Sequence, residues 1–484
     1  MSIHFGTDGW RAVIADTFTF DNVRTVAQAV ADTLIEDHGT DDLEVVIGYD
    51  TRFLSDRFAM ETAAVLAGNG ITAHLTRTDA PTPAISYNVK ARGAHAGIVI
   101  TASHNPPRYN GFKLKGPFGG SASPEMCARV EAQIAANTRA GRAPQMMRYE
   151  DALAAERIRR FDPSWTYYQH LTESLVDVDR ISERELNIVA DAMWGAGRGA
   201  FSGILSRTRS NVSDIRSDLN PGFGGIHPEP IMRHLNELVA AVQRAQAEVG
   251  LATDGDADRI GAIDARGNFI DPHHIFALTL RHLVENKGQR GDVVKTVSTT
   301  YMIDNLAAAH GLQVHETPVG FNHIAELMQS HDVLIGGEES GGISVRGHIP
   351  EGDGILMGLM LLEVMSQSRA PLHEIVDDLQ RTYGPAHYDR IDARLERALP
   401  KKQVVQMLVD HAPATLGGET VARVDTLDGV KFYLADRSWL LIRPSGTEPV
   451  LRIYAEAPST EAVKALLEAG QGMGDLLMRV PSQA

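Results

Sequence analysis

Thr101-Ala102-Ser103-His104-Asn105-Pro106 directly follows an apolar run, residues 96–100, that is typical of a buried strand. Within it, Ser103 places a hydroxyl beside the imidazole of His104, and Pro106 disfavours a helix. A nucleophilic serine needs an exposed, rigid loop and a neighbour that helps it to lose its proton. The stretch therefore indicates either a reactive serine loop or an ordinary turn that ends a strand.

A second loop, Asp254-Gly255-Asp256-Ala257-Asp258-Arg259, carries three carboxylates on alternate residues after the apolar run 249–253. Three like charges this close repel one another unless a cation lies between them. Oxygen ligands favour a hard divalent cation such as Mg²⁺ or Ca²⁺. A calcium loop would need glycine and glutamate where Arg259 and Ala265 stand. We therefore predict a magnesium site, with a solvated acidic turn as the alternative.

Two further loops gather polar and charged side chains, and the second of them is suited to a phosphate. Residues 338–342, Glu-Glu-Ser-Gly-Gly, follow the apolar strand 332–335. Residues 443–447, Arg-Pro-Ser-Gly-Thr, combine an arginine, two hydroxyls and a glycine amide within five residues. Such a set can bind a phosphate, although a hairpin turn with a surface arginine has the same composition.

The alternation of apolar strands with amphipathic helices predicts parallel, doubly wound sheets with ligands at the strand ends. Three α/β units of similar plan are visible, although their sequence similarity is too faint to prove a repeat. The fold class is therefore α/β, with three similar doubly wound domains and a smaller C-terminal α+β domain. We expect four domains at residues 1–160, 161–268, 269–381 and 382–484, with a hinge near residue 382.

Composition narrows the class of protein. The 484 residues exceed what one core usually organises, and 43% hydrophobic with 22% charged residues is typical of a soluble globular chain. We expect no membrane-spanning segment, because no run of about 18 apolar residues occurs. A single cysteine, Cys127, and no secretory signal favour the cytoplasm. A net charge of −16 argues against nucleic-acid or membrane partners, so an anionic substrate needs a local basic site.

The four loops together, in this order, resemble the α-D-phosphohexomutase family over essentially the whole chain, and most closely its bacterial phosphoglucomutases. The resemblance implies a central cleft between four domains, a phosphoserine, a bound Mg²⁺ and glucose 1,6-bisphosphate as intermediate and activator. It places the phosphoryl group on Ser103 and the metal on Ser103, Asp254, Asp256 and Asp258. It assigns proton transfer and charge balance to Arg11, His104, Lys113 and Arg259, and substrate binding to Lys295, Gly320, Glu338, Ser340, Arg443, Ser445, Gly446 and Thr447.

The expected reaction passes the phosphoryl group from Ser103 to a sugar phosphate and back, so it needs no nucleotide. This agrees with the absence of Walker A and dinucleotide motifs from the sequence. Departures from the family pattern at Asp8, Ala12 and Asn322 leave the sugar preference open. Glu339 favours glucose, because phosphoglucosamine mutases favour glutamine there.

Alternatives remain open at this point. Phosphomannomutase or phosphoglucosamine mutase activity would keep the family and change the sugar. An aspartyl-phosphate phosphatase with Asp254 as nucleophile, or a non-catalytic sugar-phosphate binder, would change the class. The sequence leaves a homodimer open.

Overall fold

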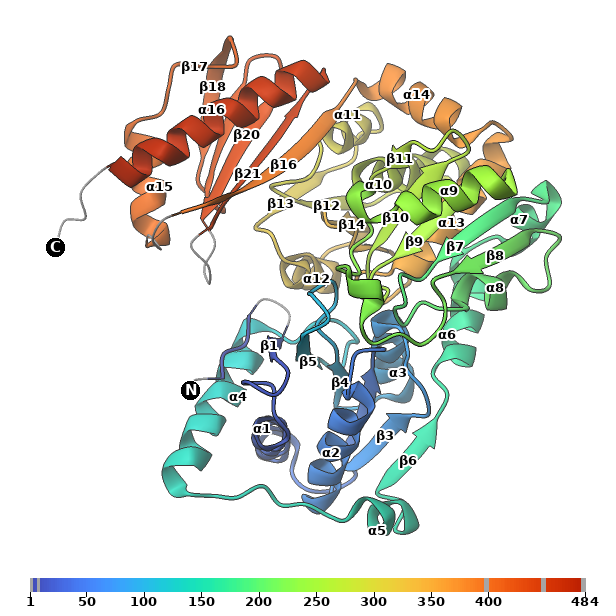
Figure 1. The fold of residues 1–484 in the computed structure, drawn as a ribbon, viewed down its shortest axis with the longest axis vertical. Coiled ribbons are helices and arrows are strands. Elements are labelled where there is room, and N and C mark those ends of the chain that lie inside the picture. The colour runs from blue at the N-terminus through green and yellow to red at the C-terminus, as the bar shows by residue number, and fades with distance from the viewer. Residues whose placement is uncertain (1–2, 7–8, 396–399, 445–449, 480–484) are drawn as a thin grey trace.

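The computed structural model describes residues 3–6, 9–395, 400–444 and 450–479. Its strands form four sheets that follow one another along the chain. In Figure 1 the first unit (blue) lies at the bottom, the second and third (green to orange) pack together above it, and the fourth (red) forms a separate lobe at the upper left.

The first unit is a six-stranded sheet in the order β1-β5-β4-β2-β3-β6 with helices around it. The segment around residues 142–162 contributes the last strand of this sheet, β6, which pairs in parallel with β3. The elements are β1 (Trp10–Val13), α1 (Phe20–His38), β2 (Glu44–Tyr49), α2 (Ser55–Gly68), β3 (Thr72–Thr76), α3 (Thr82–Arg92), β4 (Ala96–Ile100), β5 (Tyr109–Lys115), α4 (Pro124–Ala140), α5 (Tyr149–Ala154) and β6 (Ile158–Phe161).

The second unit has a five-stranded sheet in the order β11-β10-β9-β7-β8. Its elements are α6 (Ser164–His170), the π-turn η1 (Leu171–Leu175), α7 (Val178–Arg184), β7 (Asn187–Asp191), α8 (Ala200–Leu205), β8 (Asn211–Ile215), the 3₁₀ turns η2 (Phe223–Gly225) and η3 (Met232–His234), α9 (Asn236–Ala245), β9 (Val249–Thr253), β10 (Ile260–Asp264) and β11 (Phe269–Ile270).

The third unit has a four-stranded sheet in the order β13-β12-β14-β15. Its elements are α10 (Pro272–Arg281), the π-turn η4 (His282–Asn286), β12 (Asp292–Thr296), α11 (Met302–Ala309), β13 (Val314–Thr317), α12 (Phe321–Ser330), β14 (Val333–Gly337), β15 (Ile343–Val345), α13 (Gly354–Ser368) and α14 (Leu372–Tyr383).

The three units share one strand order, which the sequence only hinted at. Read from one edge, the order is β5-β4-β2-β3 in the first, β10-β9-β7-β8 in the second and β15-β14-β12-β13 in the third. The three-domain α/β prediction is confirmed, but the sheets are mixed rather than purely parallel. Each of the three loops with predicted site residues joins two antiparallel strands: β4 to β5, β9 to β10 and β14 to β15. The reason is loop length, because a parallel return needs a crossover of about a dozen residues or more.

Helix α13 joins the second and third units into one hydrophobic core. Its residues from Gly354 to Ser366 are buried. The same core cluster contains Leu251 of the second sheet, Met357 of α13 and Leu334 of the third sheet. The first unit has a core of its own, which includes Phe18, Phe58 and Ile98. The serine loop (residues 101–106) and the aspartate loop (residues 254–259) therefore lie on domains whose main cores are separate.

The fourth unit is the predicted smaller α+β domain. Its six strands are all antiparallel, in the order β16-β21-β20-β19-β18-β17, and its long C-terminal helix crosses the sheet (Figure 1). The elements are β16 (His387–Arg394), α15 (Lys401–Asp410), β17 (Thr415–Leu416), β18 (Glu419–Asp425), β19 (Val430–Leu434), β20 (Trp439–Pro444), β21 (Val450–Ala457) and α16 (Thr460–Arg479). None of the helices in the described ranges is both long and apolar enough to cross a bilayer.

Candidate active site

Ser103 lies at the first turn of the loop that follows β4, and it is almost fully buried. Its φ of +50° is in the left-handed region, which non-glycine residues seldom adopt. The Thr101 hydroxyl accepts the Ser103 amide proton at 2.9 Å, and Arg52 donates to the Ser103 carbonyl. The Ser103 hydroxyl donates to Oδ2 of Asp254 at 2.8 Å. The two predicted loops, 151 residues apart, therefore meet at this bond.

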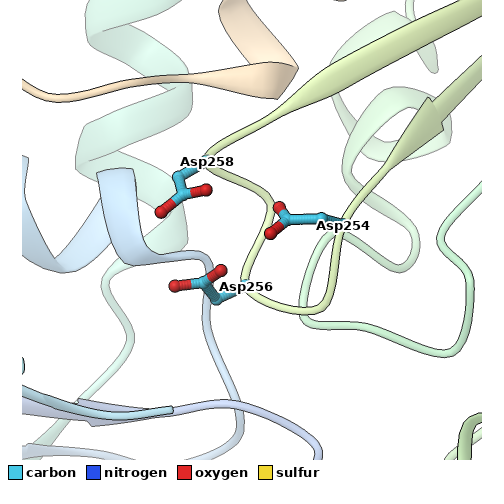
Figure 2. A group of neighbouring side chains, drawn as sticks. All are labelled: Asp254, Asp256 and Asp258. Atoms are coloured by element: carbon cyan, nitrogen blue, oxygen red, sulfur yellow. The ribbon is translucent and has the colours of Figure 1, made fainter. Parts of the chain in front are cut away.

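Asp254, Asp256 and Asp258 lie on the turn between β9 and β10, and Figure 2 shows their carboxylates facing one another. One oxygen from each lies within 4.8 Å of the others, and all three residues are buried. Burial, Asp258 and Asp256 raise the pKa of Asp254 well above its usual range. Oδ1 of Asp258 is buried and has no hydrogen-bond donor among the described residues. A cluster of buried carboxylates with an unsatisfied oxygen fits a hard divalent cation.

Lys113 and Arg259 supply positive charge to this carboxylate cluster. The ammonium of Lys113, on β5, lies 2.9 Å from Oδ2 of Asp256 and 2.8 Å from Oδ2 of Asp258, with no exposed side-chain surface. The guanidinium of Arg259 lies 3.8 Å from Oδ1 of Asp258, and its amide donates to Asp254 at 3.2 Å. Lys113 therefore bridges the first and second domains through the carboxylates of Asp256 and Asp258.

His104 and Arg11 lie beside the serine. Nδ1 of His104 is 3.4 Å from the Ser103 hydroxyl oxygen, and Arg11 donates to Oδ1 of Asn105 at 2.8 Å. Burial lowers the pKa of His104 well below its usual value, and the positive charges of Arg259 and Arg11 lower it further. A neutral imidazole can accept a proton, as a general base requires.

The third loop brings Gly320, Glu338 and Ser340 together. Oε1 of Glu338 accepts the Gly320 amide at 2.9 Å, and the Ser340 hydroxyl lies 3.5 Å from Oε2 of Glu338. Burial raises the pKa of Glu338 to about 8, and the negative charge of Glu339 acts in the same direction. The positive charge of Arg259, in the aspartate loop, lowers this pKa.

Lys295 is not among these contacts in the described structure. Its ammonium pairs with Asp304, donates to the Thr300 carbonyl at 3.2 Å and lies 3.7 Å from Glu316. Its substrate-binding role stays a prediction. So does that of Arg443 on β20, whose guanidinium pairs with Asp428 and lies 3.3 Å from the Tyr454 hydroxyl.

Ser445, Gly446 and Thr447, together with Asp8 of the opening motif, lie outside the described residues.

Sequence reasoning missed Asp50, Arg52 and Thr82. Asp50 and Arg52 follow β2 directly, and they contact the serine loop. Thr82, at the start of α3, donates its hydroxyl to Oδ2 of Asp256 at 2.7 Å and its amide to the Asp256 carbonyl at 2.8 Å. A signal was present for Asp50, because this charged residue stands directly after an apolar strand, as Asp254 does in the aspartate loop.

Profiles described as "Phosphoglucomutase/phosphomannomutase, alpha/beta/alpha domain" I, II and III match residues 2–141, 166–267 and 271–383, and the profile of the C-terminal domain matches residues 393–469. The chain belongs to the phosphoglucomutase/phosphomannomutase family. The matched segments follow the four sheets in order, with β6 falling between the first two.

Members of this phosphohexomutase family align with the chain along nearly its whole length. A phosphoglucomutase/phosphomannomutase of Thermococcus kodakarensis is 30% identical over 471 residues, covering 96% of this chain and 97% of that protein. A phosphoglucosamine mutase of Geobacillus kaustophilus is 30% identical over 476 residues, covering 97% of each. A solved Thermus thermophilus structure described as a phosphomannomutase is 34% identical, with a TM-score of 0.84 over 98% of this chain and 100% of that one. These relatives are named as mutases, which supports the prediction that this protein is an enzyme.

Proposed function

We propose that this enzyme interconverts α-D-glucose 1-phosphate and glucose 6-phosphate through a phosphoserine at Ser103 and a bisphosphorylated sugar intermediate. The observation that carries the proposal is the 2.8 Å bond between the Ser103 hydroxyl and Asp254. A phosphoryl group on this hydroxyl would lie beside the carboxylates, where a bound cation would neutralise its charge.

Each residue of the site has a role in this proposal. A sugar hydroxyl attacks phosphorus, the bond to the Ser103 oxygen breaks, and the neutral His104 imidazole takes the hydroxyl proton and passes it to the departing Ser103 oxygen. Asp254, Asp256 and Asp258 would hold Mg²⁺, which supplies charge neutralisation at the transferring group. Lys113, Arg259 and Arg11 add positive charge around it. In the return step the other phosphate passes to Ser103, so the serine ends phosphorylated and glucose 1,6-bisphosphate acts as activator.

The sugar itself would lie against the third and fourth loops. Glu338 and Ser340, with the Gly320 amide beside them, can bind sugar hydroxyls. Arg443 with Ser445, Gly446 and Thr447 would bind the phosphate that is not transferred, and Lys295 would contribute charge. Guanidinium and hydroxyl groups are suited to a phosphate dianion.

Glucosamine 1-phosphate is the second candidate substrate, because several relatives at 29–31% identity are named phosphoglucosamine mutases. Glu339 supports glucose, since phosphoglucosamine mutases favour glutamine there. A coupled assay with glucose, mannose and glucosamine 1-phosphates separates these substrates. The proposal predicts the largest kcat/KM for glucose 1-phosphate, and a larger value for glucosamine would overturn that choice.

Intact mass and site mapping test the mechanism. We expect one phosphate on Ser103 after incubation with glucose 1,6-bisphosphate and none in Ser103→Ala, which should also lose turnover. Turnover that survives in Ser103→Ala, with a phosphate labile to hydroxylamine, would instead favour an aspartyl phosphate at Asp254.

A further inference from the structure

Arg52 lies just beyond β2 with its guanidinium buried against the backbone of the serine loop. Nη2 donates to the carbonyl of Ser103 and, at 2.7 Å, to that of Asn105. Nη1 donates to the carbonyls of Pro106 at 2.9 Å and Tyr109 at 3.1 Å. The side chain has no exposed surface. One guanidinium therefore holds four carbonyls of the loop that carries the serine.

Asp50 fixes Arg52 and reaches the serine from the other side. Its Oδ2 accepts from Nε of Arg52 at 3.0 Å and from the Thr101 hydroxyl at 2.7 Å. The Thr101 hydroxyl oxygen in turn accepts the Ser103 amide. The Ser103 carbonyl therefore accepts a hydrogen bond from Arg52 directly, and the Ser103 amide is linked to Asp50 through the Thr101 hydroxyl. These bonds can stabilise the left-handed backbone of the serine.

The same segment contacts the second domain. The guanidinium carbon of Arg52 lies 4.9 Å from the centre of the Phe223 ring, and the Thr51 hydroxyl donates to the Trp194 carbonyl at 2.7 Å. Phe223 and Trp194 belong to the domain that carries the aspartate loop. The segment 50–52 therefore connects the serine loop to that domain.

Resting on the proposed function, we infer that Arg52 is a positioning residue for phosphoryl transfer: it holds the Ser103 hydroxyl at Asp254. The planar fork of the guanidinium is what allows four carbonyls to be held at once. A lysine keeps the charge but presents its donors from a single nitrogen. Arg52→Lys therefore separates the geometry of the side chain from its charge.

The test compares Arg52→Lys with Arg216→Lys, a control in the second domain. The side chain of Arg216 is also largely covered, and its guanidinium pairs with Asp191 rather than with the serine loop. With glucose 1-phosphate and glucose 1,6-bisphosphate, we expect kcat of Arg52→Lys to fall about 10- to 100-fold, because small displacements of a reacting group cost that much. KM and the Mg²⁺ concentration for half-maximal activity should not change, because the third loop and the aspartates are intact.

Hydrogen exchange provides a readout that does not depend on turnover. Amides of the peptide 101–110 should exchange faster in Arg52→Lys and in the milder Asp50→Asn, and as in the wild type in Arg216→Lys. If Arg52→Lys does not fold, kcat and hydrogen exchange are measured on Asp50→Asn instead.

Wild-type kcat in Arg52→Lys and Asp50→Asn, or an equal loss in Arg216→Lys, would overturn the inference, as would unchanged exchange. A wild-type protein that turns over no sugar 1-phosphate would contradict the proposed function instead, and the exchange rates would still decide whether Arg52 holds the loop.

Discussion

Gly255, in the aspartate loop, lies directly against the backbone of Ser103. A Cβ built on Gly255 would stand only 2.4 Å from the Ser103 carbonyl oxygen, closer than real Cβ atoms approach a neighbour. The next Cβ contact would be the Pro228 side chain at 3.1 Å. The absence of a side chain at this position therefore allows the serine loop and the aspartate loop to touch.

Gly255→Ala should separate these two loops and lower kcat about 10- to 100-fold, because the reacting groups would be displaced by a fraction of an ångström or more. Steady-state kinetics of glucose 1-phosphate conversion measure the loss. Gly472→Ala on α16 is the control, since nothing lies within 4 Å of its added Cβ. It should keep wild-type kcat and gain up to about 1 kcal/mol of unfolding free energy, as expected for a helical glycine. Equal kcat in both variants would contradict the role of Gly255.

Thr82→Val should weaken Mg²⁺ binding about 10- to 100-fold, which is the usual cost of losing a hydrogen bond to a metal ligand. Its hydroxyl donates to Asp256, and valine keeps the shape of the side chain without the donor. Calorimetric titration with Mg²⁺ measures the affinity. Thr62→Val is the control, because the buried Thr62 hydroxyl donates to the Phe58 carbonyl within α2. A Thr82→Val affinity equal to that of Thr62→Val would show that this bond does not support the metal site.

Lys113→Met should destabilise the metal-free protein by about 3–5 kcal/mol, because it leaves the buried carboxylates of Asp256 and Asp258 without their shared cation. Added Mg²⁺ should raise the melting temperature more in this variant than in the wild type, since the metal replaces the missing charge. Lys115→Met is a matched control on the same strand: Lys115 is equally buried and pairs with Glu351. If Mg²⁺ raises the melting temperature of both variants equally, the aspartate loop is not the site of its action.

His274 should make stability depend on pH. Its Nδ1 lies 2.6 Å from Oδ1 of Asp271; burial opposes the charged imidazole, but the Asp271 carboxylate outweighs it and raises the pKa of His274 above 6.5. Above pH 6.5 the folded state therefore keeps a proton that the unfolded state releases. This stabilisation is complete below pH 6.5 and is lost as pH rises through the folded pKa.

His274→Gln should therefore lower the unfolding free energy more at pH 6 than at pH 9. The difference should be about 1.4 kcal/mol for each pH unit by which folding raises the pKa of His274. Urea unfolding of both proteins at the two pH values measures it. An equal loss at both values would show that the histidine is not charged in the folded protein.

The fourth domain should move on ligand binding, because it meets the third through a mixed interface: a small apolar cluster that includes Val297 and Trp439, and several polar contacts. The Tyr433 hydroxyl donates to Oε1 of Glu316 at 2.6 Å, and Lys431 donates to the Val297 carbonyl at 2.6 Å. Tyr433→Phe removes one such bond, worth about 1 kcal/mol. Small-angle scattering should show a larger change between free and glucose 6-phosphate-bound states in this variant. Identical profiles with and without ligand in both proteins would count against a hinge near residue 382.

Local sequence patterns were enough to predict three α/β units and the loops that follow their strands. Residues 96–100, 249–253 and 333–337 are apolar runs that end in polar loops, and each is a buried strand in the structure. The direction of the strand after each loop was missed, because the pattern of side chains does not distinguish a parallel from an antiparallel neighbour. The short length of these loops did indicate an antiparallel neighbour, since a parallel return needs a longer crossover.

The sequence by itself indicated which residues to expect at the active site, since the serine loop and the three aspartates each lie within a few consecutive positions. Only the tertiary structure decided that Ser103 and Asp254 touch, that Lys113 spans two domains and that Arg52 and Thr82 hold the two loops. The physical reason is that such contacts depend on how separately packed cores are placed against each other. Hydrophobic periodicity describes each core alone and contains nothing about the distance between them.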